Sequence, residues 1–151
     1  IADMLLGRLP EDGIPYWDFD DPAIPDALRD ASAGAIMSSA FAELAGMTAS
    51  STRSKAYRQM AERQLRTLAS EEYLASPGTN GGFLLKHSVG NIPGGTEIDV
   101  PLSYADYYFI EALRRLIEYA VPLGSSLRCL SRGLLSVGDN CLIHSKISTC
   151  L

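Results

Sequence analysis

The chain has 151 residues, of which 46% are hydrophobic and 21% are charged, and its formal net charge is −5. This composition is typical of a globular protein about one domain long and excludes a disordered chain. Acidic residues outnumber basic ones by 18 to 13, so no surplus of Lys and Arg exists to displace counterions from phosphates. We therefore expect neither nucleic acid nor a membrane as a partner.

The first residues have the pattern of a helix that is already ending. Ile1 to Leu6 are mostly apolar, and Gly7 and Pro10, which follow them, are residues that close helices. The chain also begins without Met. From these two signs we expect that the N-terminal part of a longer domain is missing.

Residues 14–35, IPYWDFDDPAIPDALRDASAGA, combine five aspartates with three aromatic residues in a proline-rich stretch. A calcium loop needs oxygen ligands at alternating positions and Gly at the sixth, and the sequence places Pro22 and Ala23 in that part. We therefore expect no metal here. The plainer interpretation makes Asp20, Asp26 and Asp30 turn and cap residues, with Asp30 capping the following helix.

The aromatic residues Tyr16, Trp17 and Phe19 leave two interpretations open. They could be anchored under the helices, which is the ordinary fate of large aromatic side chains. Alternatively they could face a sugar, because an aromatic ring packs on the C–H side of a sugar while nearby carboxylates accept hydrogen bonds from its hydroxyls.

Two helices are predicted next. Residues 31–46 have apolar side chains at helical spacing and small residues on the opposite face, with Glu43 as the only charge, so we expect an inner helix packed on both sides. Residues 52–69 carry one apolar stripe with basic residues around the rest, which predicts a surface helix capped by Ser51 or Ser54.

A long loop and a third helix follow. Residues 76–103 are rich in Gly and Pro, and only Phe83 to Leu85 suit a short strand or hairpin. Residues 103–118 have a nearly ideal apolar stripe, with Ser103 and Asp106 arranged as a capping box. We expect Glu111 and Arg115 to pair on the exposed side of this helix.

The loop before the third helix contains the remaining candidates for chemistry. Lys86, His87 and Ser88 stand between a short apolar run and Gly90. A lone His is more often a hydrogen-bonded structural group, but Lys and His beside a glycine turn could also hold an anionic substrate group. Two further carboxylates, those of Glu97 and Asp99, precede the helix.

The three cysteines, Cys129, Cys141 and Cys150, all lie near the C-terminus, so no disulfide framework holds the main body together. Their spacing is too wide for a metal knuckle. Residues 120–151 show neither helical nor strand periodicity. We expect a domain over residues 1–119 and an irregular tail over 120–151.

A repeated order of acidic loop and helix indicates stacked helical hairpins, either in an open solenoid or in a closed toroid. Three segments in this order resemble the C-terminal part of glycoside hydrolase family 88, the unsaturated glucuronyl hydrolases. They are PYWDFDDPAIPDALRDASAGAI, GGFLLKHSVGN and EIDVPLSYADYYFIEALRR. The resemblance covers about residues 1–118 and excludes the cysteine-containing tail.

The resemblance implies an all-α fold, a partial (α/α)6 six-hairpin toroid with long loops. It also implies a reaction that uses neither a metal nor an organic cofactor: an Asp protonates the double bond of a 4,5-unsaturated uronic acid and directs water onto the adjacent carbon. The substrates would be unsaturated uronic-acid oligosaccharides left by polysaccharide lyases. The catalytic aspartates of the family match no position of this chain, so we assign no catalytic residue and expect the chain alone to be inactive.

Loops before inner helices face the active-site side in this family. The resemblance therefore makes seven residues candidates for lining or supporting the cleft: Trp17, Asp18, Arg29, Lys86, His87, Ser88 and Glu97. Two alternatives remain open at this point, an unsaturated rhamnogalacturonyl hydrolase and a non-catalytic helical-repeat binding module. The sequence leaves the oligomeric state open.

Overall fold

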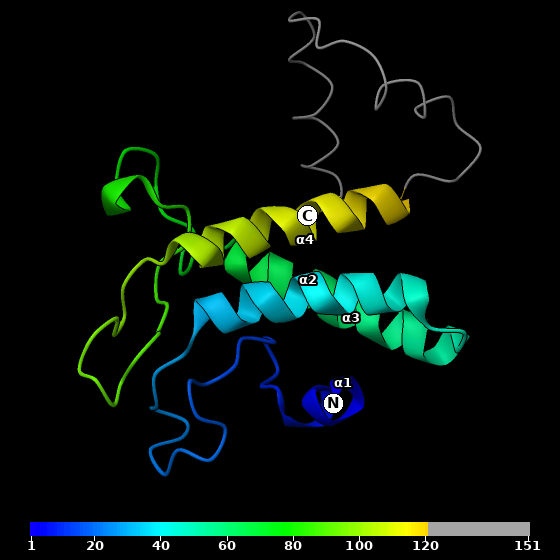
Figure 1. The fold of residues 1–151 in the computed structure, drawn as a ribbon, viewed down its shortest axis with the longest axis horizontal. Helices are drawn as coiled ribbons and strands as arrows, with labels where there is room; N and C mark the ends of the chain where they lie inside the picture. Colours follow the sequence, from blue (N-terminus) through cyan, green and yellow to red (C-terminus); the bar gives the residue numbers. More distant parts are fainter. Residues whose placement is uncertain (121–151) are drawn as a thin grey trace, which may run out of the picture. The chain divides into compact units, whose positions relative to one another are not determined.

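The structure, a computed structural model, describes residues 1–120 (Figure 1). This part contains four α-helices and a single 3-10 turn, and its only β pairing is in isolated bridges. The elements are α1 (Ala2–Arg8), α2 (Ala31–Met47), α3 (Ser51–Leu68), η1 (Asn80–Gly82) and α4 (Ser103–Ala120). The predicted all-α class is confirmed. The expectations for the tail beyond residue 120 and for the cysteines lie outside the described residues.

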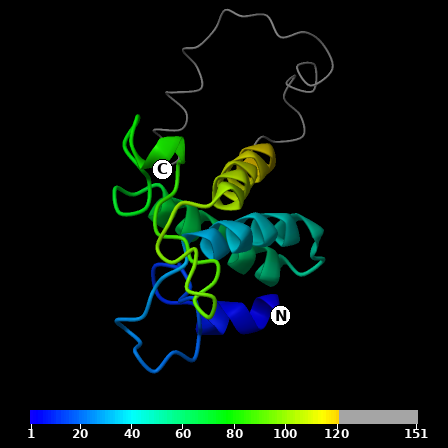
Figure 2. The same ribbon diagram turned by 60° about the vertical axis from the view of Figure 1, so that its left-hand side comes forward.

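Helices α2 and α3 form an antiparallel hairpin, and a short turn joins them (Figures 1 and 2). Small and hydroxyl-bearing residues let the two backbones approach closely, since Ser38 Oγ donates to the carbonyl oxygen of Ala61 at 3.1 Å. The Phe41 and Tyr57 rings meet at 5.8 Å between centroids. The surface helix predicted for residues 52–69 is thus confirmed to within one residue at each end.

The cap of α3 differs from the prediction. Ser50, not Ser51 or Ser54, is the N-cap, and its Oγ accepts from the backbone N–H of Arg53 at 3.3 Å. Ser54 instead donates to the carbonyl oxygen of Ala45 at 2.6 Å and so ties α3 to the last turn of α2. Four hydroxyl residues, Ser50, Ser51, Thr52 and Ser54, stand close together here, and their order alone does not show which one lies outside the helix.

Helix α4 runs parallel to α2 and completes the helical layer (Figure 1). Its predicted apolar stripe is confirmed up to Leu116, because Ala105, Phe109 and Ala112 are buried in one cluster with Leu65 and Leu68 of α3, but Ile117, predicted to belong to the stripe, is exposed. Burial of this kind contributes about 25 cal/mol for each Å² of apolar surface removed from water. The stripe therefore fixes which face of α4 meets the hairpin.

The predicted orientation of α2 is partly wrong. The small residues form its most buried face, and Ile36, Ala40 and Leu44, placed by the sequence on the apolar stripe, are exposed. Small side chains allow the close contacts with α3 and α4. The size of a side chain, and not its hydrophobicity, therefore determines which residues of α2 are buried. Among the described residues, α2 packs against both α3 and α4, and the face that carries Ile36, Ala40 and Leu44 is open.

Helix α1 also differs at its end. It continues through Gly7 to Arg8 and is followed by Leu9 in an extended conformation. Gly7 therefore does not close the helix, whereas Pro10 lies just beyond it, as predicted. Leu5 and Leu6 pack against the apolar cluster between α2 and α3.

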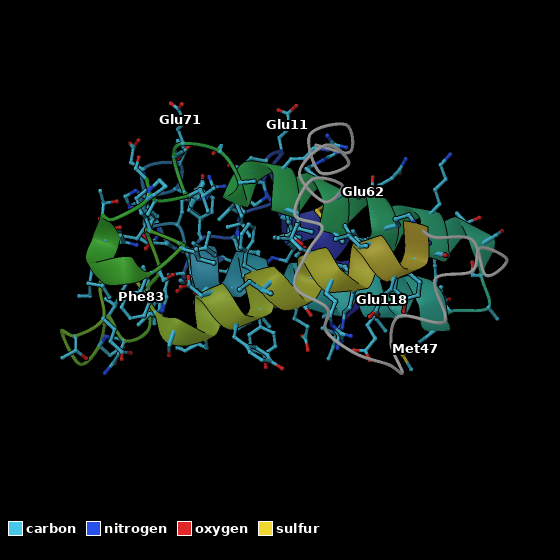
Figure 3. All side chains as sticks on the ribbon, turned by 90° about the horizontal axis from the view of Figure 1, so that it is seen from above. Glu11, Met47, Glu62, Glu71, Phe83 and Glu118 are labelled. Atoms are coloured by element: carbon cyan, nitrogen blue, oxygen red, sulfur yellow. The ribbon has the colours of Figure 1, made fainter. Side chains whose placement is uncertain are left out.

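The loops gather at the end of the molecule where α2 and α4 begin (Figures 1 and 2). Figure 3 shows Glu71 and Phe83 at this end and Met47, the last residue of α2, at the opposite end. The strand predicted at Phe83 to Leu85 is wrong, since Leu85 makes only an isolated bridge to Leu74. Residues 88–100 instead fold back on themselves as a narrow hairpin through two isolated bridges.

Asp106 explains why no strand forms there. Its carboxylate accepts from the backbone N–H groups of Leu84 and Leu85, at 2.8 and 2.9 Å, so these amides are not available to a β ladder. The predicted capping box with Ser103 is wrong for the same reason. The carboxylate in the first turn of α4 anchors a distant loop instead of its own helix.

Candidate functional site

Asp30 connects the start of α2 with the loop that precedes α4. It is buried, and its Oδ1 accepts from the Ser32 backbone N–H at 2.9 Å, which confirms the predicted N-cap. The same oxygen accepts from the Ser32 hydroxyl at 2.6 Å and from the Val89 N–H at 3.1 Å. The backbone N–H of Ala31 also donates to the His87 carbonyl at 3.0 Å. The residues around His87 are thereby fixed to the helix.

His87 and Asp99 form a pair in this fixed loop. His87 Nδ1 lies 2.6 Å from Asp99 Oδ1, and both side chains are about half exposed. The Tyr73 ring meets the imidazole edge-on at 6.0 Å. Both members of the pair have positive φ, 60° and 53°, a conformation that costs roughly 1 kcal/mol or more outside Gly. The loop therefore orients the imidazole and leaves Nε2 as the nitrogen without a partner in the described residues.

Lys86 and Glu97 lie beside this pair in sequence, but their contacts differ. Lys86 Nζ donates to the backbone carbonyl of Glu71 at 2.8 Å, and no carboxylate among the described residues forms an ion pair with it. Glu97 is exposed, with φ of 54°, and its carbonyl accepts from the Gly90 N–H at 2.7 Å. The Lys86 ammonium is thus held against the chain, and the Glu97 side chain lies over Gly90.

Ser88 does not line the surface of this chain. It is fully buried, its backbone pairs with Val100, and its Oγ has no hydrogen-bond partner. A buried hydroxyl without a partner is uncommon and costs stability. Of the four candidates in this loop, Ser88 is thus the one whose side chain is enclosed by the protein.

Arg29 supports the acidic loop rather than extending into solvent. Its Nε and Nη2 donate to the Ile14 carbonyl at 3.0 and 2.6 Å, and its guanidinium forms an ion pair with Asp12. The guanidinium also lies over the Tyr16 ring, 4.6 Å from the centroid. These contacts hold the beginning and the end of residues 12–30 together next to Asp30.

Trp17 and Asp18 belong to the same loop. Trp17 is half-buried, so neither a wholly buried anchor nor a fully exposed platform describes it. Asp18 is exposed, and its Oδ1 accepts from the Asp20 N–H at 2.8 Å, as expected of a turn residue. Asp20 pairs with Arg8. Across residues 1–120, no group of three or more His, Cys, Asp or Glu side chains is arranged to hold a metal ion.

The seven predicted residues therefore fall into two sets, one in residues 12–30 and one in residues 86–97, and Asp30 joins the two loops. No hydrogen bond or ion pair within residues 1–120 links two of the seven side chains directly. No helix in this part of the chain is long and apolar enough to cross a membrane.

Sequence reasoning missed a second polar cluster, between α2 and α4. Ser39 Oγ donates to Glu111 Oε2 at 2.6 Å, and Arg115 Nη1 donates to the Ser39 carbonyl and Oγ, both at 2.9 Å. Arg115 also pairs with Glu43 at 3.1 Å and with Glu111 at 3.6 Å. The predicted pairing of Glu111 with Arg115 is confirmed, but its predicted position on an exposed side is wrong, because both side chains face α2.

This cluster lines an open groove of about 310 Å³, together with Tyr107 and Tyr108. The hydrogen bond from Ser39 and, to a smaller extent, the charge of Arg115 lower the pKa of Glu111 below its ordinary value. Glu111 therefore stays ionised in this groove at neutral pH. The only sequence signal for this cluster was the i, i+4 spacing of Glu111 and Arg115. That spacing does not show which face of the helix is turned inward.

Two parallel helices backed by an antiparallel third, with long loops at one end, match a solved structure. A crystal structure of an unsaturated glucuronyl hydrolase specific for heparin aligns with a TM-score of 0.74 and 44% identity, over 82% of this chain and 33% of that chain. The class is therefore the six-hairpin glycosidase fold, of which this chain forms a partial toroid. This decides between the solenoid and the toroid in favour of the toroid.

Curated relatives give the family. No family model matches the sequence. An unsaturated glucuronyl hydrolase of Formosa agariphila is 54% identical over 108 residues, 72% of this chain and 26% of the relative. One from Bacillus sp. strain GL1 is 33% identical over 117 residues, 77% of this chain and 31% of the relative. The chain thus belongs to the unsaturated glucuronyl hydrolases, glycoside hydrolase family 88, and spans about a quarter to a third of the length of these relatives.

Proposed function

We propose that this chain is part of a hydrolase that removes a 4,5-unsaturated uronic acid from the non-reducing end of lyase-derived oligosaccharides. A proton adds to one carbon of the vinyl-ether double bond, the hydroxyl of water adds to the neighbouring carbon, and the hemiketal that results opens to release the remaining sugar. The observation that carries the proposal is the 54% identity to the Formosa agariphila enzyme over 72% of this chain. The catalytic aspartates would come from outside the chain.

The contacts of Lys86 and His87 support a role in holding the acidic sugar. Lys86 keeps a positive charge that no carboxylate within residues 1–120 pairs with, because its partner is a backbone carbonyl. Asp99 holds the His87 ring in one orientation, so Nε2 can meet a hydroxyl or carboxylate of the substrate without a further loss of side-chain freedom. Glu97 is exposed in the same hairpin.

The acidic loop, residues 12–30, would form the other part of the binding site, next to Asp30. The half-buried Trp17 offers an aromatic face, and the exposed Asp18 offers a carboxylate oxygen to sugar hydroxyls. Arg29 and Ser88 would act indirectly, since Arg29 holds the loop through Asp12 and Ile14, and Ser88 is buried within the hairpin.

A chimeric enzyme tests the proposal. The segment of the Formosa agariphila relative that this chain matches would be replaced by the corresponding residues of this chain. We expect the chimera to consume unsaturated glycosaminoglycan disaccharides, measured by the loss of ultraviolet absorbance of the conjugated double bond. A correctly folded chimera without turnover would refute the function, and preference for unsaturated pectin fragments would favour a rhamnogalacturonyl hydrolase.

Variants of the chimera test the residue assignment separately. Lys86→Ala and His87→Ala should each raise KM by about tenfold, the effect of losing a charge-assisted hydrogen bond of roughly 1.4 kcal/mol. Lys55→Ala, at an exposed position of α3, is the matched control and should leave KM unchanged. Unchanged KM in all three variants would remove Lys86 and His87 from the site and leave the proposed reaction standing.

A further inference from the structure

Arg8, the last residue of α1, makes three contacts with two consecutive residues of the acidic loop. Its guanidinium forms an ion pair with Asp20 and donates to the Phe19 carbonyl at 3.3 Å. The guanidinium also lies over the Phe19 ring, 5.1 Å from the centroid. The Arg8 and Asp20 side chains are 40% and 81% exposed, so their ion pair adds little to the global stability of the fold. These contacts instead fix where this part of the loop lies.

Helix α1 gives Arg8 a fixed base. Leu5 and Leu6 pack against the apolar cluster between α2 and α3. Near the beginning of α1, the Asp3 carboxylate accepts from the Tyr57 hydroxyl of α3 at 2.7 Å. Because α1 is attached to the other helices in this way, Arg8 connects the acidic loop to the helical layer.

Arg29 holds the same part of the loop from the other direction. Its guanidinium lies over the Tyr16 ring, 4.6 Å from the centroid. Tyr16 directly precedes Trp17 and Asp18, and Phe19 directly follows them. The two candidate residues therefore stand between two aromatic rings, each of which contacts a guanidinium. One guanidinium belongs to the end of the loop and the other to α1.

We propose that Arg8 is a positioning residue that orients Trp17 and Asp18 for contact with the sugar. Asp18 Oδ1 accepts from the backbone N–H of Asp20 at 2.8 Å, so the ion pair of Arg8 with Asp20 also holds the turn that contains Asp18. A binding group that is held in place before the substrate arrives loses less conformational freedom on binding. Arg8 acts through the loop and not by touching the substrate. The inference rests on the proposed function, in which Trp17 and Asp18 meet the sugar.

The fluorescence of Trp17 tests this positioning without substrate, since Trp17 is the only tryptophan of the chain. In Arg8→Ala we expect the emission maximum to shift to longer wavelength and quenching by acrylamide to increase, because the loop is released toward solvent. Arg8→Lys keeps the charge but not the planar guanidinium, and should lie between Arg8→Ala and the wild type. Arg114→Ala, which breaks an exposed ion pair with Glu118 in α4, is the matched control and should leave both signals unchanged.

The chimera, built so that it contains Arg8 and the whole acidic loop, tests the consequence for binding. Arg8→Ala should raise KM at least about threefold and leave kcat within about twofold, because the loop contributes binding that is equal in the ground state and the transition state. Asp20→Asn removes the ion pair from the loop side and should also raise KM. Adding it to Arg8→Ala should raise KM no further, since both changes remove the same contact. Arg114→Ala should leave KM unchanged.

Two results would overturn the role of Arg8. One is an unchanged fluorescence of Trp17 in Arg8→Ala, and the other is an unchanged KM in an active chimera that carries this substitution. An inactive chimera with Arg8 in place would refute the proposed function instead. The fluorescence of the chain itself would then still decide whether Arg8 holds Trp17 in position.

Discussion

The helices and the loops of this chain are held in place by different forces. The contact of α2, α3 and α4 rests on buried small and apolar residues, such as Ala35, Ala61 and Phe109. The loops before α2 and α4 bury a few side chains as well, but their course follows carboxylates that accept from distant backbone N–H groups. Asp30 binds Val89, and Asp106 binds Leu84 and Leu85. Packing forms the helical layer, whereas directed polar contacts shape the candidate site.

The largest effect should come from Asp30, where the two regions meet. Asp30→Ala removes the cap of α2 and the link to Val89 together, and leaves buried N–H groups without an acceptor. We expect a loss of about 2–4 kcal/mol in the free energy of unfolding, measured by urea denaturation. Hydrogen exchange should accelerate at both Ser32 and Val89.

Asp30→Asn separates charge from hydrogen bonding at the same position. Its side-chain oxygen can still accept, so we expect less than half of the loss caused by Asp30→Ala. If Asp30→Ala accelerated exchange at Ser32 but not at Val89, the loop would be held by packing alone. The proposed difference between the forces that hold the helices and those that hold the loops would then be wrong for Asp30.

Asp106 should have the next largest effect, confined to the loop. Asp106→Ala leaves the N–H groups of Leu84 and Leu85 without their acceptor, and we expect a loss of about 1–2 kcal/mol. Exchange at these two amides should accelerate while exchange within α3 stays unchanged. Asp26→Ala, in an exposed part of the other loop, is the control. Equal losses of stability in Asp106→Ala and Asp26→Ala would show that the carboxylate contacts of Asp106 do not stabilise this loop specifically.

This difference in forces explains how much the sequence could predict. The ranges of α2, α3 and α4 followed from the 3.6-residue period, and the Asp30 cap followed from residue type. The buried face of α2 did not follow, because its small residues are buried for their size and not for their hydrophobicity. The contacts of Asp106, Asp99 and Ser39 join residues far apart in the chain, and no local pattern encodes them.

The candidate site shows the same limit. The sequence placed Lys86, His87 and Trp17 in loops near helix N-termini, and the structure has them there. In the structure, Arg29 contacts Asp12 and Ile14, and Ser88 is fully buried. Both arrangements depend on how the loops fold back on α2. Sequence patterns locate such loops, but the direction of a side chain within them is set by tertiary contacts.

Two buried serines offer a finer comparison of the two regions. Ser38 in α2 donates to the carbonyl oxygen of Ala61, whereas Ser88, in the loop before α4, has an Oγ without a hydrogen-bond partner. Ser38→Ala should cost about 1 kcal/mol, and Ser88→Ala should be neutral or stabilising by up to about 1 kcal/mol, because it removes an unpaired polar group. Urea denaturation of both variants measures the difference. A loss of stability in Ser88→Ala would reveal a bond that the structure does not contain.

The smallest effect concerns Glu111, a carboxylate that lies between α2 and α4 and shares Arg115 with Glu43. Its folded-state pKa lies below the ordinary value of 4.5, chiefly because Ser39 donates to it and secondarily because Arg115 is near. Its stabilising contribution is therefore present above pH 4.5 and is lost as the pH falls through the folded-state pKa. Glu111→Gln should lower stability by up to about 1 kcal/mol at pH 7, and this difference should vanish in acid. Glu118→Gln breaks the exposed pair with Arg114 and is the control, which should leave stability at pH 7 almost unchanged. If the two variants lost equal stability at pH 7, the contact between α2 and α4 would depend on apolar packing alone, and helices and loops would differ more in their stabilising forces than these contacts imply.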